Sequence, residues 1–212
     1  ITNSATSAPT TNVITLLNAA STTYNGLIAD HAGGTGAKIG LFVTGPGTLT
    51  LNPANNNTFS GGMVISNSGV AFGNVLNGSL YSPGTGLITL LGTNTSLYMA
   101  GSGGSTTPYY TPLTNMVVLP GGQTASIYGP SRGAVGCTLL GAGTLYYNST
   151  YVRDSISGDW SAFTGPIILS GNATGGNIGL NVTNGFPNSF VTINTNVALY
   201  GTVAGTPTIP IG

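Results

Sequence analysis

Few side chains of this sequence could carry acid–base or metal chemistry. The chain has three Lys or Arg, three Asp or Glu and one His. A lyase needs a base with neighbouring carboxylates, and a glycosidase needs two carboxylates at a set separation. Asp154 and Asp159 could pair, but Arg153 lies beside them as a neutralising partner. We therefore expect no enzyme activity and no cofactor; a structural calcium held by backbone carbonyls is conceivable but not indicated.

Three other features are interpreted as structural. Asp30-His31 precedes a Gly-rich turn, and one Asp beside one His is too little for a metal site or a nucleophile triad. Cys137 is the single cysteine, so no disulfide can form within the chain, and its apolar neighbours predict a buried thiol. Asn55, Asn56 and Asn57 suit a tight corner, because Asn tolerates left-handed backbone.

Tyrosines repeatedly follow aliphatic residues that we expect to face inward. Because strand side chains alternate between faces, each such Tyr should point outward. An uncharged stripe of Tyr bordered by Asn, Thr and Ser would suit the apolar face and hydroxyl rim of a neutral sugar. The alternative is that these are ordinary strand-forming residues. The candidates for sugar contact are Tyr98, Tyr128, Tyr146 and Tyr200.

A second candidate is the segment 151–160, which holds three of the six charges and the only Trp. A functional loop on a rigid scaffold would concentrate rare residue types in this way. Trp160 would stack on a sugar, Asp154 and Asp159 would accept hydrogen bonds from hydroxyls, and Arg153 would donate. The alternative is a structural plug, in which Arg153 pairs with an Asp and Trp160 fills the space between coils.

The composition restricts the partners and the location of the chain. Charged residues make up 3% of the sequence, against about 25% in typical soluble domains. Nucleic acid is excluded as a partner, because its binding depends on basic residues. Residues 1–12 lack the pattern of a signal peptide, and no apolar run is long enough to span a membrane. We expect a folded, monomeric module, excised from a larger secreted or surface protein and tethered there to other domains.

Short apolar runs separated by Gly, Asn or Pro corners dominate the chain, and no stretch has helical periodicity. This pattern predicts either a β-solenoid or a multi-stranded sandwich. The expected strands are Val13–Leu17, Lys38–Val43, Thr48–Leu51, Met63–Ser66, Val70–Phe72, Leu87–Leu91, Ser96–Met99, Met116–Leu119, Ala125–Tyr128, Cys137–Leu140, Thr144–Tyr147, Pro166–Leu169, Ile178–Val182, Phe190–Ile193 and Val197–Tyr200.

Internal repetition favours the solenoid. Residues 45–49 (GPGTL) recur as residues 141–145 (GAGTL), an offset of 141 − 45 = 96, and 59–61 (FSG) recur as 163–165 (FTG), an offset of 163 − 59 = 104. We attribute the difference in offset to a loop insertion, and the alignment places Tyr146 where the first copy has Thr50. Repeats that cannot bury a face alone must stack on one another.

The regular copy also resembles a known family. Residues 27–73, with the motifs GPGTLTL at 45–51 and TFSGG at 58–62, look like the autotransporter-associated β-strand repeat of bacterial surface and secreted proteins; the match over 141–201 is weaker. The resemblance implies an all-β fold, a single-stranded right-handed parallel β-helix, over the single domain 1–212. The family includes autotransporter passengers and polysaccharide-degrading proteins, so it indicates the fold better than the function.

The leading functional hypothesis is a non-catalytic module that binds a neutral polysaccharide such as a xylan. The first alternative is a passenger or adhesin stalk with a structural role. The second is a β-helical polysaccharide lyase or hydrolase.

Overall fold

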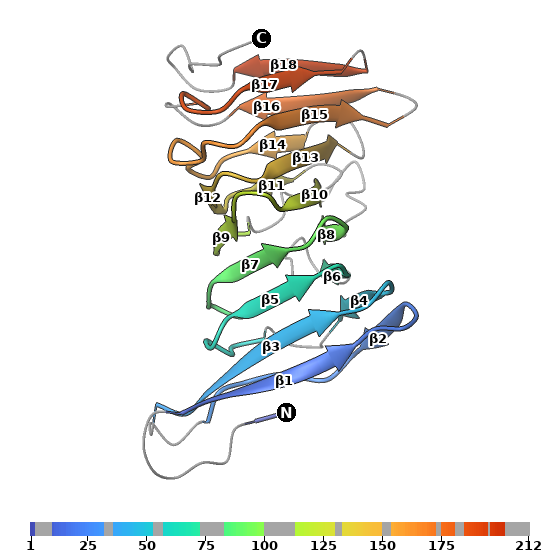
Figure 1. The fold of residues 1–212 in the computed structure, drawn as a ribbon, viewed down its shortest axis with the longest axis vertical. Helices are drawn as coiled ribbons and strands as arrows, with labels where there is room; N and C mark the ends of the chain where they lie inside the picture. Colours follow the sequence, from blue (N-terminus) through green and yellow to red (C-terminus); the bar gives the residue numbers. More distant parts are fainter. Residues whose placement is uncertain are drawn as a thin grey trace.

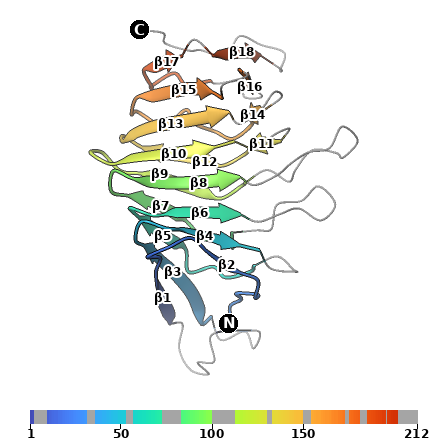
Figure 2. The same ribbon diagram turned by 90° about the vertical axis from the view of Figure 1, so that its right-hand side faces the viewer.

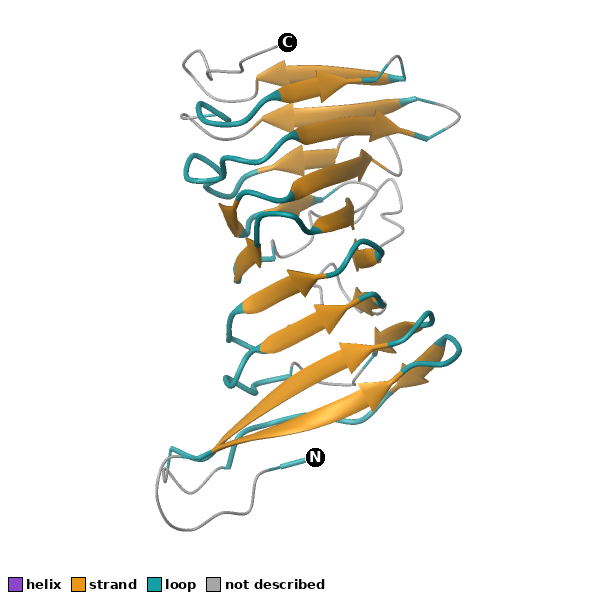
Figure 3. Cartoon of the chain, in the orientation of Figure 1, coloured by secondary structure: helices purple, strands orange, loops and turns teal. Residues whose placement is uncertain are grey.

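The chain folds into a stack of short parallel strands that wind around one apolar core (Figure 1). The computed structural model describes residues 1–2, 10–31, 36–52, 57–72, 83–99, 113–129, 133–149, 154–172, 175–180, 185–194 and 196–201. All regular structure in these segments is strand (Figure 3). The described residues therefore include no helix that could span a membrane.

The strands form three parallel sheets that run along the stack. A six-stranded sheet has the order β1-β3-β5-β7-β9-β12, an eight-stranded sheet has the order β17-β15-β13-β10-β8-β6-β4-β2, and a four-stranded sheet has the order β11-β14-β16-β18. The strands are β1 Thr11–Leu17, β2 Thr22–Tyr24, β3 Lys38–Thr44, β4 Thr48–Leu51, β5 Met63–Ser66, β6 Gly69–Phe72, β7 Ile88–Leu91, β8 Thr95–Met99, β9 Met116–Leu119, β10 Thr124–Tyr128, β11 Ala134–Val135, β12 Thr138–Gly141, β13 Thr144–Ser149, β14 Asp154–Ile156, β15 Ile167–Gly171, β16 Gly176–Leu180, β17 Val191–Ile193 and β18 Val197–Gly201.

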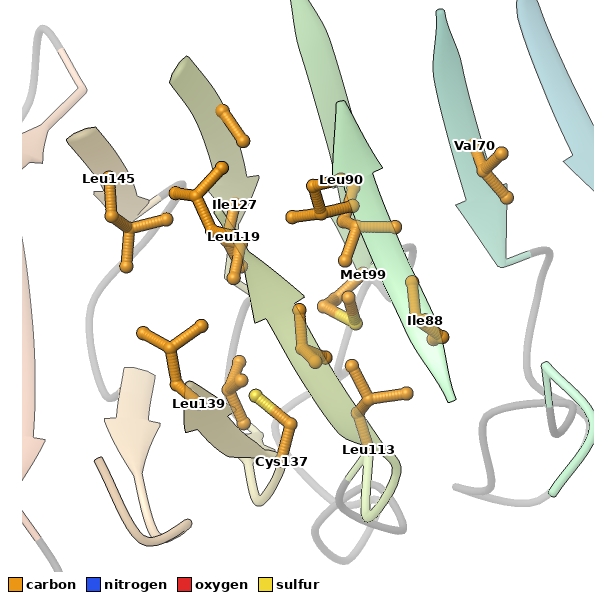
Figure 4. Close-up of a cluster of buried hydrophobic side chains, with 14 of the residues drawn as sticks. Val70, Ile88, Leu90, Met99, Leu113, Leu119, Ile127, Cys137, Leu139 and Leu145 are labelled. Atoms are coloured by element: carbon orange, nitrogen blue, oxygen red, sulfur yellow. The ribbon is translucent and has the colours of Figure 1, made fainter. Parts of the chain in front are cut away.

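Alternation of side chains along each strand creates the core. In β5, for example, Met63 and Ile65 are buried while Val64 and Ser66 are half-exposed. The inward residues of successive coils stack on one another, so that Val70, Leu90 and Ile127 belong to one continuous apolar cluster (Figure 4). Cys137 is part of this cluster, as expected, and burial raises the pKa of its thiol to about 12. These features confirm the predicted parallel β-solenoid.

Every strand expected from the sequence is present, with boundaries displaced by at most a few residues. Three short strands were not predicted: Thr22–Tyr24, Ala134–Val135 and Asp154–Ile156. These strands are two or three residues long, and each has at most one strongly apolar inward residue. The alternation of apolar and polar residues is therefore too short to predict them. The strand Asp154–Ile156 lies inside segment 151–160, for which the sequence left a functional loop and a structural plug as alternatives.

Polar side chains at the corners tie one coil to the next. The Asn57 side-chain oxygen accepts a hydrogen bond from Ile28 N–H at 2.9 Å, which confirms the structural interpretation of Asn57; Asn55 and Asn56 lie outside the described residues. Asp30 accepts from Ile39 N–H at 2.7 Å and from Ser60 N–H at 3.0 Å. Burial opposes ionisation of Asp30, but a hydrogen bond from the Ser60 hydroxyl, the two backbone bonds and nearby Lys38 lower its pKa overall.

The two GTL copies make the same turn but do not stack in register. Gly45 and Gly141 both have positive φ, 104° and 109°, at the step from the six-stranded to the eight-stranded sheet. Leu140, however, stands in one row with Val118, Thr89, Val64 and Phe42. Gly141 therefore aligns with the residue after Phe42, two positions before Gly45. The sequence alignment of the copies is shifted by two residues from the spatial register.

The predicted loop insertion between the copies is wrong. Phe59 directly precedes β5 of the six-stranded sheet, whereas Phe163 bridges Gly141 and precedes β15 of the eight-stranded sheet. The two Phe residues thus occupy different corners of the coil. Both are buried core residues, which is why the motif recurs without marking equivalent positions.

The alternating core makes a direct prediction for two neighbours on β5. Ile65→Ala should lower the free energy of unfolding by about 2–5 kcal/mol, because it opens a cavity between stacked coils. Val64→Ala, on the outward face, should lower it by well under half of that amount. Urea unfolding followed by circular dichroism measures both values, and equal losses would contradict the assigned inward and outward faces.

Candidate functional site

Three of the four candidate tyrosines, Tyr98, Tyr128 and Tyr146, lie on strands of the eight-stranded sheet, which runs along the stack (Figure 2). Strand pairing aligns its outward side chains into two adjacent rows. The first row is Thr48, Gly69, Ser96, Ser126, Tyr146, Ile168 and Thr192. The second row is Thr23, Thr50, Ala71, Tyr98, Tyr128, Asn148 and Ser170. No position in either row is charged.

Tyr98 and Tyr128 are neighbours in the second row and stack on each other. Their ring centroids are 4.5 Å apart and their planes differ by 9°. The ring of Tyr98 also leans over Gly69, where an added Cβ would lie 3.1 Å from Tyr98 Cε2. One face of each ring is therefore used inside the pair, and the Tyr98 ring also packs over the neighbouring strand at Gly69.

Tyr146 extends this pair into the first row. It pairs with Ser126, two residues before Tyr128, so its Cα lies diagonally about 8 Å from that of Tyr128, given the strand spacing and rise. Tyr146 is 41% exposed, more than either stacked ring. We call Tyr98, Tyr128 and Tyr146 the tyrosine patch. The sequence alignment placed Tyr146 at the position of Thr50. Because the spatial register of the copies is shifted by two residues, Tyr146 instead aligns with Thr48.

A polar hollow continues the second row beyond the patch. It has a volume of about 440 Å³ and is lined by Ser170, Gly171, Ile193, Asn194 and Asn196. Asn194 Nδ2 donates a hydrogen bond to Ser170 Oγ at 2.7 Å across two coils. Amide and hydroxyl groups thus follow the aromatic rings along one face, with Asn148 between them.

Tyr200 does not join the tyrosine patch. It is 42% exposed but lies on β18, in the row with Ala134, Ser155 and Gly179 on the four-stranded sheet. Tyr200 is therefore separated from the other three candidate tyrosines, a point that the sequence had left open. Sequence alternation could assign it outward, but could not say to which side of the coil.

Trp160 is a core residue, which contradicts its predicted role in sugar stacking. It is fully buried, and its Nε1 donates a hydrogen bond to the carbonyl oxygen of Cys137 at 3.0 Å. Its ring contacts Tyr147 edge-on, with centroids 5.8 Å apart, and Phe186 at 5.5 Å. Trp160 fills space between coils, as the plug alternative predicted, and its indole cannot reach a polysaccharide.

Asp154 is also buried and points into the core, which contradicts its predicted role toward sugar hydroxyls. It occupies the inward row with Ile178 and Leu199, against Gly129 and the Tyr147 hydroxyl. No described group reaches either carboxyl oxygen with good hydrogen-bonding geometry. Burial raises the pKa of Asp154 well above its ordinary value, and the nearby Tyr147 hydroxyl only partly offsets this.

Asp159 is exposed, and its carboxylate forms hydrogen bonds within its own turn. Its Oδ1 accepts hydrogen bonds from Ser161 Oγ at 2.6 Å and Ser161 N–H at 2.9 Å, which lower its pKa. Arg153 lies outside the described residues. Among the candidates on this segment that the structure describes, only Asp159 is at the surface. Its carbonyl accepts a hydrogen bond from Leu139 N–H of β12, so it lies beside the six-stranded sheet and not on the sheet that carries the tyrosine patch.

Among the described residues, no group of three or more His, Cys, Asp or Glu side chains could hold a metal ion. Comparison with protein-family models, with curated proteins and with solved structures gives no match to this chain.

The buried carboxyl predicts an unusual pH dependence. Because the folded-state pKa of Asp154 is raised, its contribution to stability is complete below the unfolded pKa of about 3.9 and is lost as pH rises toward the folded-state value. Asp154→Asn keeps the shape and stays neutral. We expect it to unfold at a higher temperature than the parent chain at pH 8 and at a similar temperature at pH 4.

Asp159→Asn is the matched control, because its hydrogen bonds lower the pKa of Asp159 and give the opposite sign. This substitution should cost stability only above the unfolded pKa of Asp159, where its carboxylate is charged. Thermal unfolding of the three chains between pH 4 and pH 8 provides the comparison. Parallel pH profiles for the parent and Asp154→Asn would contradict the assignment of Asp154 as a buried, protonated acid.

Proposed function

We propose that this chain is a non-catalytic module that binds a neutral polysaccharide, such as a xylan, on the outer face of its eight-stranded sheet. The observation that carries the proposal is the tyrosine patch on an uncharged face, with the amide of Asn148 and the hydroxyl of Ser170 following it in the second row. The tyrosine patch replaces the wider set of residues suggested by the sequence, since Trp160 and Asp154 are buried.

Binding at the patch would use ring contacts and hydroxyl hydrogen bonds together. The ring of Tyr146 and the outer face of Tyr128 offer apolar surface to a sugar, and the tyrosine hydroxyls can donate and accept. Asn148 and Ser170 follow in the same row and lead to the polar hollow. The absence of charge on both rows favours a neutral glycan over an acidic one, because nothing there would pair with a carboxylate.

The rigidity of the scaffold supports this reading. The patch residues lie within regular strands whose neighbouring side chains, Leu97, Ile127 and Leu145, are fully buried. Side chains on strands anchored in this way lose little freedom when they bind a ligand, which favours affinity.

A structural role, as a stalk segment of a surface protein, is the second candidate. It rests on the continuous core and on the stacking of all three sheets along one axis (Figure 1). In that case Tyr98 and Tyr128 would only cover the backbone of the sheet, and no glycan would bind.

Affinity electrophoresis against neutral and acidic polysaccharides separates the two candidates. We expect retardation by a neutral xylan-type glycan and not by pectin or alginate. Tyr146→Ala and Tyr128→Ala should each weaken binding about tenfold, equivalent to about 1.4 kcal/mol. Migration unaffected by every glycan would leave the stalk as the supported function.

Tyr200→Ala is the matched control, because it removes an equally exposed tyrosine from another sheet. It should bind as the parent chain does. Thermal unfolding of each variant checks that loss of binding is not loss of fold, which matters most for Tyr128 because it also loses its stacking partner. Equal losses for Tyr200→Ala and Tyr146→Ala would refute the tyrosine patch as the site.

A further inference from the structure

An exposed phenylalanine shares the outer face of the eight-stranded sheet with the tyrosine patch. Phe190 is 60% exposed and is not part of the buried apolar cluster. It directly precedes β17, whose first residue, Val191, is fully buried, so the alternation of side chains turns Phe190 outward. Its carbonyl accepts a hydrogen bond from Ile167 N–H at 2.9 Å, which holds it opposite Pro166, the residue before β15.

Phe190 continues the line of the tyrosine patch across the sheet. Tyr98 and Tyr128 stand in the second row, Tyr146 and Ile168 in the first, and Phe190 one outward position earlier again. They come from the successive strands β8, β10, β13, β15 and β17 (Figure 2). From Tyr98 to Tyr146 the line crosses two strand spacings and moves back two residues, and from Tyr146 to Phe190 it does the same. Strand spacing and rise make each of these two Cα separations about 12 Å.

Apolar surface fills the space between Tyr146 and Phe190. Ile168 is half-exposed and pairs with Tyr146 in the first row. Pro166 is exposed and lies beside Phe190. No polar outward position of β15 therefore interrupts the line. We call Tyr98, Tyr128, Tyr146, Ile168 and Phe190 the diagonal track.

Polar, uncharged side chains border the diagonal track on both sides. On one side are Thr124, Ser126 and Thr144. On the other side are Asn148, Ser170 and Asn194. A sugar presents an apolar ring face and a rim of hydroxyls, so an apolar line between donors and acceptors matches a chain of sugars lying along it.

The spacing of the coils also suits a chain of sugars. From each strand to the next, the diagonal track advances by about 6 Å on average, from the strand spacing and one residue of rise. This step is close to the length of one pyranose ring in an extended glycan. The five strands from β8 to β17 therefore offer room for one ring each.

We propose that the glycan lies along the diagonal track, with about one ring on each coil, and that Phe190 is a further binding residue at the end distant from Tyr98. The inference rests on the proposed function and adds to it a direction across the strands and a preferred length. The ligand is then an extended stretch of a neutral polysaccharide. A monosaccharide or a disaccharide would leave most of the track uncovered.

Isothermal titration calorimetry with linear xylo-oligosaccharides, from the dimer to the hexamer, tests the inference. The affinity of the parent chain should rise with each added ring up to the pentamer and change little beyond it. Phe190→Ala should weaken binding of the pentamer about tenfold, through loss of one ring contact, and leave the trimer unchanged. A trimer covers the three tyrosines and does not reach Phe190. Tyr146→Ala should weaken binding of both.

Two control variants separate a ring contact from a general effect. Phe190→Tyr keeps an aromatic ring and should bind the pentamer as the parent chain does. Met116→Ala removes a side chain that is 48% exposed on the six-stranded sheet, and should leave binding at every length unchanged. Thermal unfolding should differ little among the parent, Phe190→Ala and Phe190→Tyr, because Phe190 lies outside the core.

Failure of the track and failure of the proposed function give different results. Unchanged pentamer binding by Phe190→Ala, with loss in Tyr146→Ala, would overturn the diagonal track and leave the tyrosine patch as the site. A parent affinity that stops rising at the trimer would do the same. Absence of binding by every oligosaccharide would also overturn the track, and the proposed function would fail with it only if no polysaccharide retarded the chain in affinity electrophoresis.

Discussion

The fold depends on one repeated interaction, the parallel backbone pairing of each coil with the coils before and after it. Strands separated by about 4.8 Å bring residues at the same position of successive coils into contact. Like charges at that spacing would repel along the whole stack, whereas apolar, hydroxyl and amide side chains can stack on themselves. The near absence of charge from the sequence is therefore consistent with the architecture, and it leaves hydrogen bonding and apolar burial to stabilise the protein.

Several polar side chains inside this stack bond to the backbone of another coil, whereas a few buried polar atoms among the described residues have no partner. Asn57, Asp30 and the Trp160 indole each close a corner by bonding a backbone group of another coil. Asp154 does not, since no described group satisfies its carboxyl oxygens. Its cost is reduced by protonation, because a neutral carboxyl is far cheaper to bury than a charged one. The coil tolerates it where Gly129 leaves room for the side chain.

The same pairing shapes the surface on which the proposed function rests. Stacking places the outward side chains of neighbouring coils in straight rows, so that Tyr98 and Tyr128 meet face to face although thirty residues separate them.

The sequence by itself determined the class of the fold, the strands with clear alternation and the identity of the outward tyrosines. These follow from local chemistry: corners of Gly, Asn and Pro, and the two-residue period of a strand. It could not determine the register between coils, because a shift of two residues keeps every side chain on its own face. For that reason the sequence placed Tyr146 over Thr50, and could not show that Tyr200 lies on another sheet.

Only the tertiary structure decided which rare residues are accessible. Trp160 and Asp154 stand among charged and polar neighbours in the sequence, as a surface loop would have them. The short strand Asp154–Ile156 turns Asp154 into the core, and the coil that follows buries Trp160 against Tyr147 and Phe186. Burial here is set by which coils lie above and below a residue, and that information is not local.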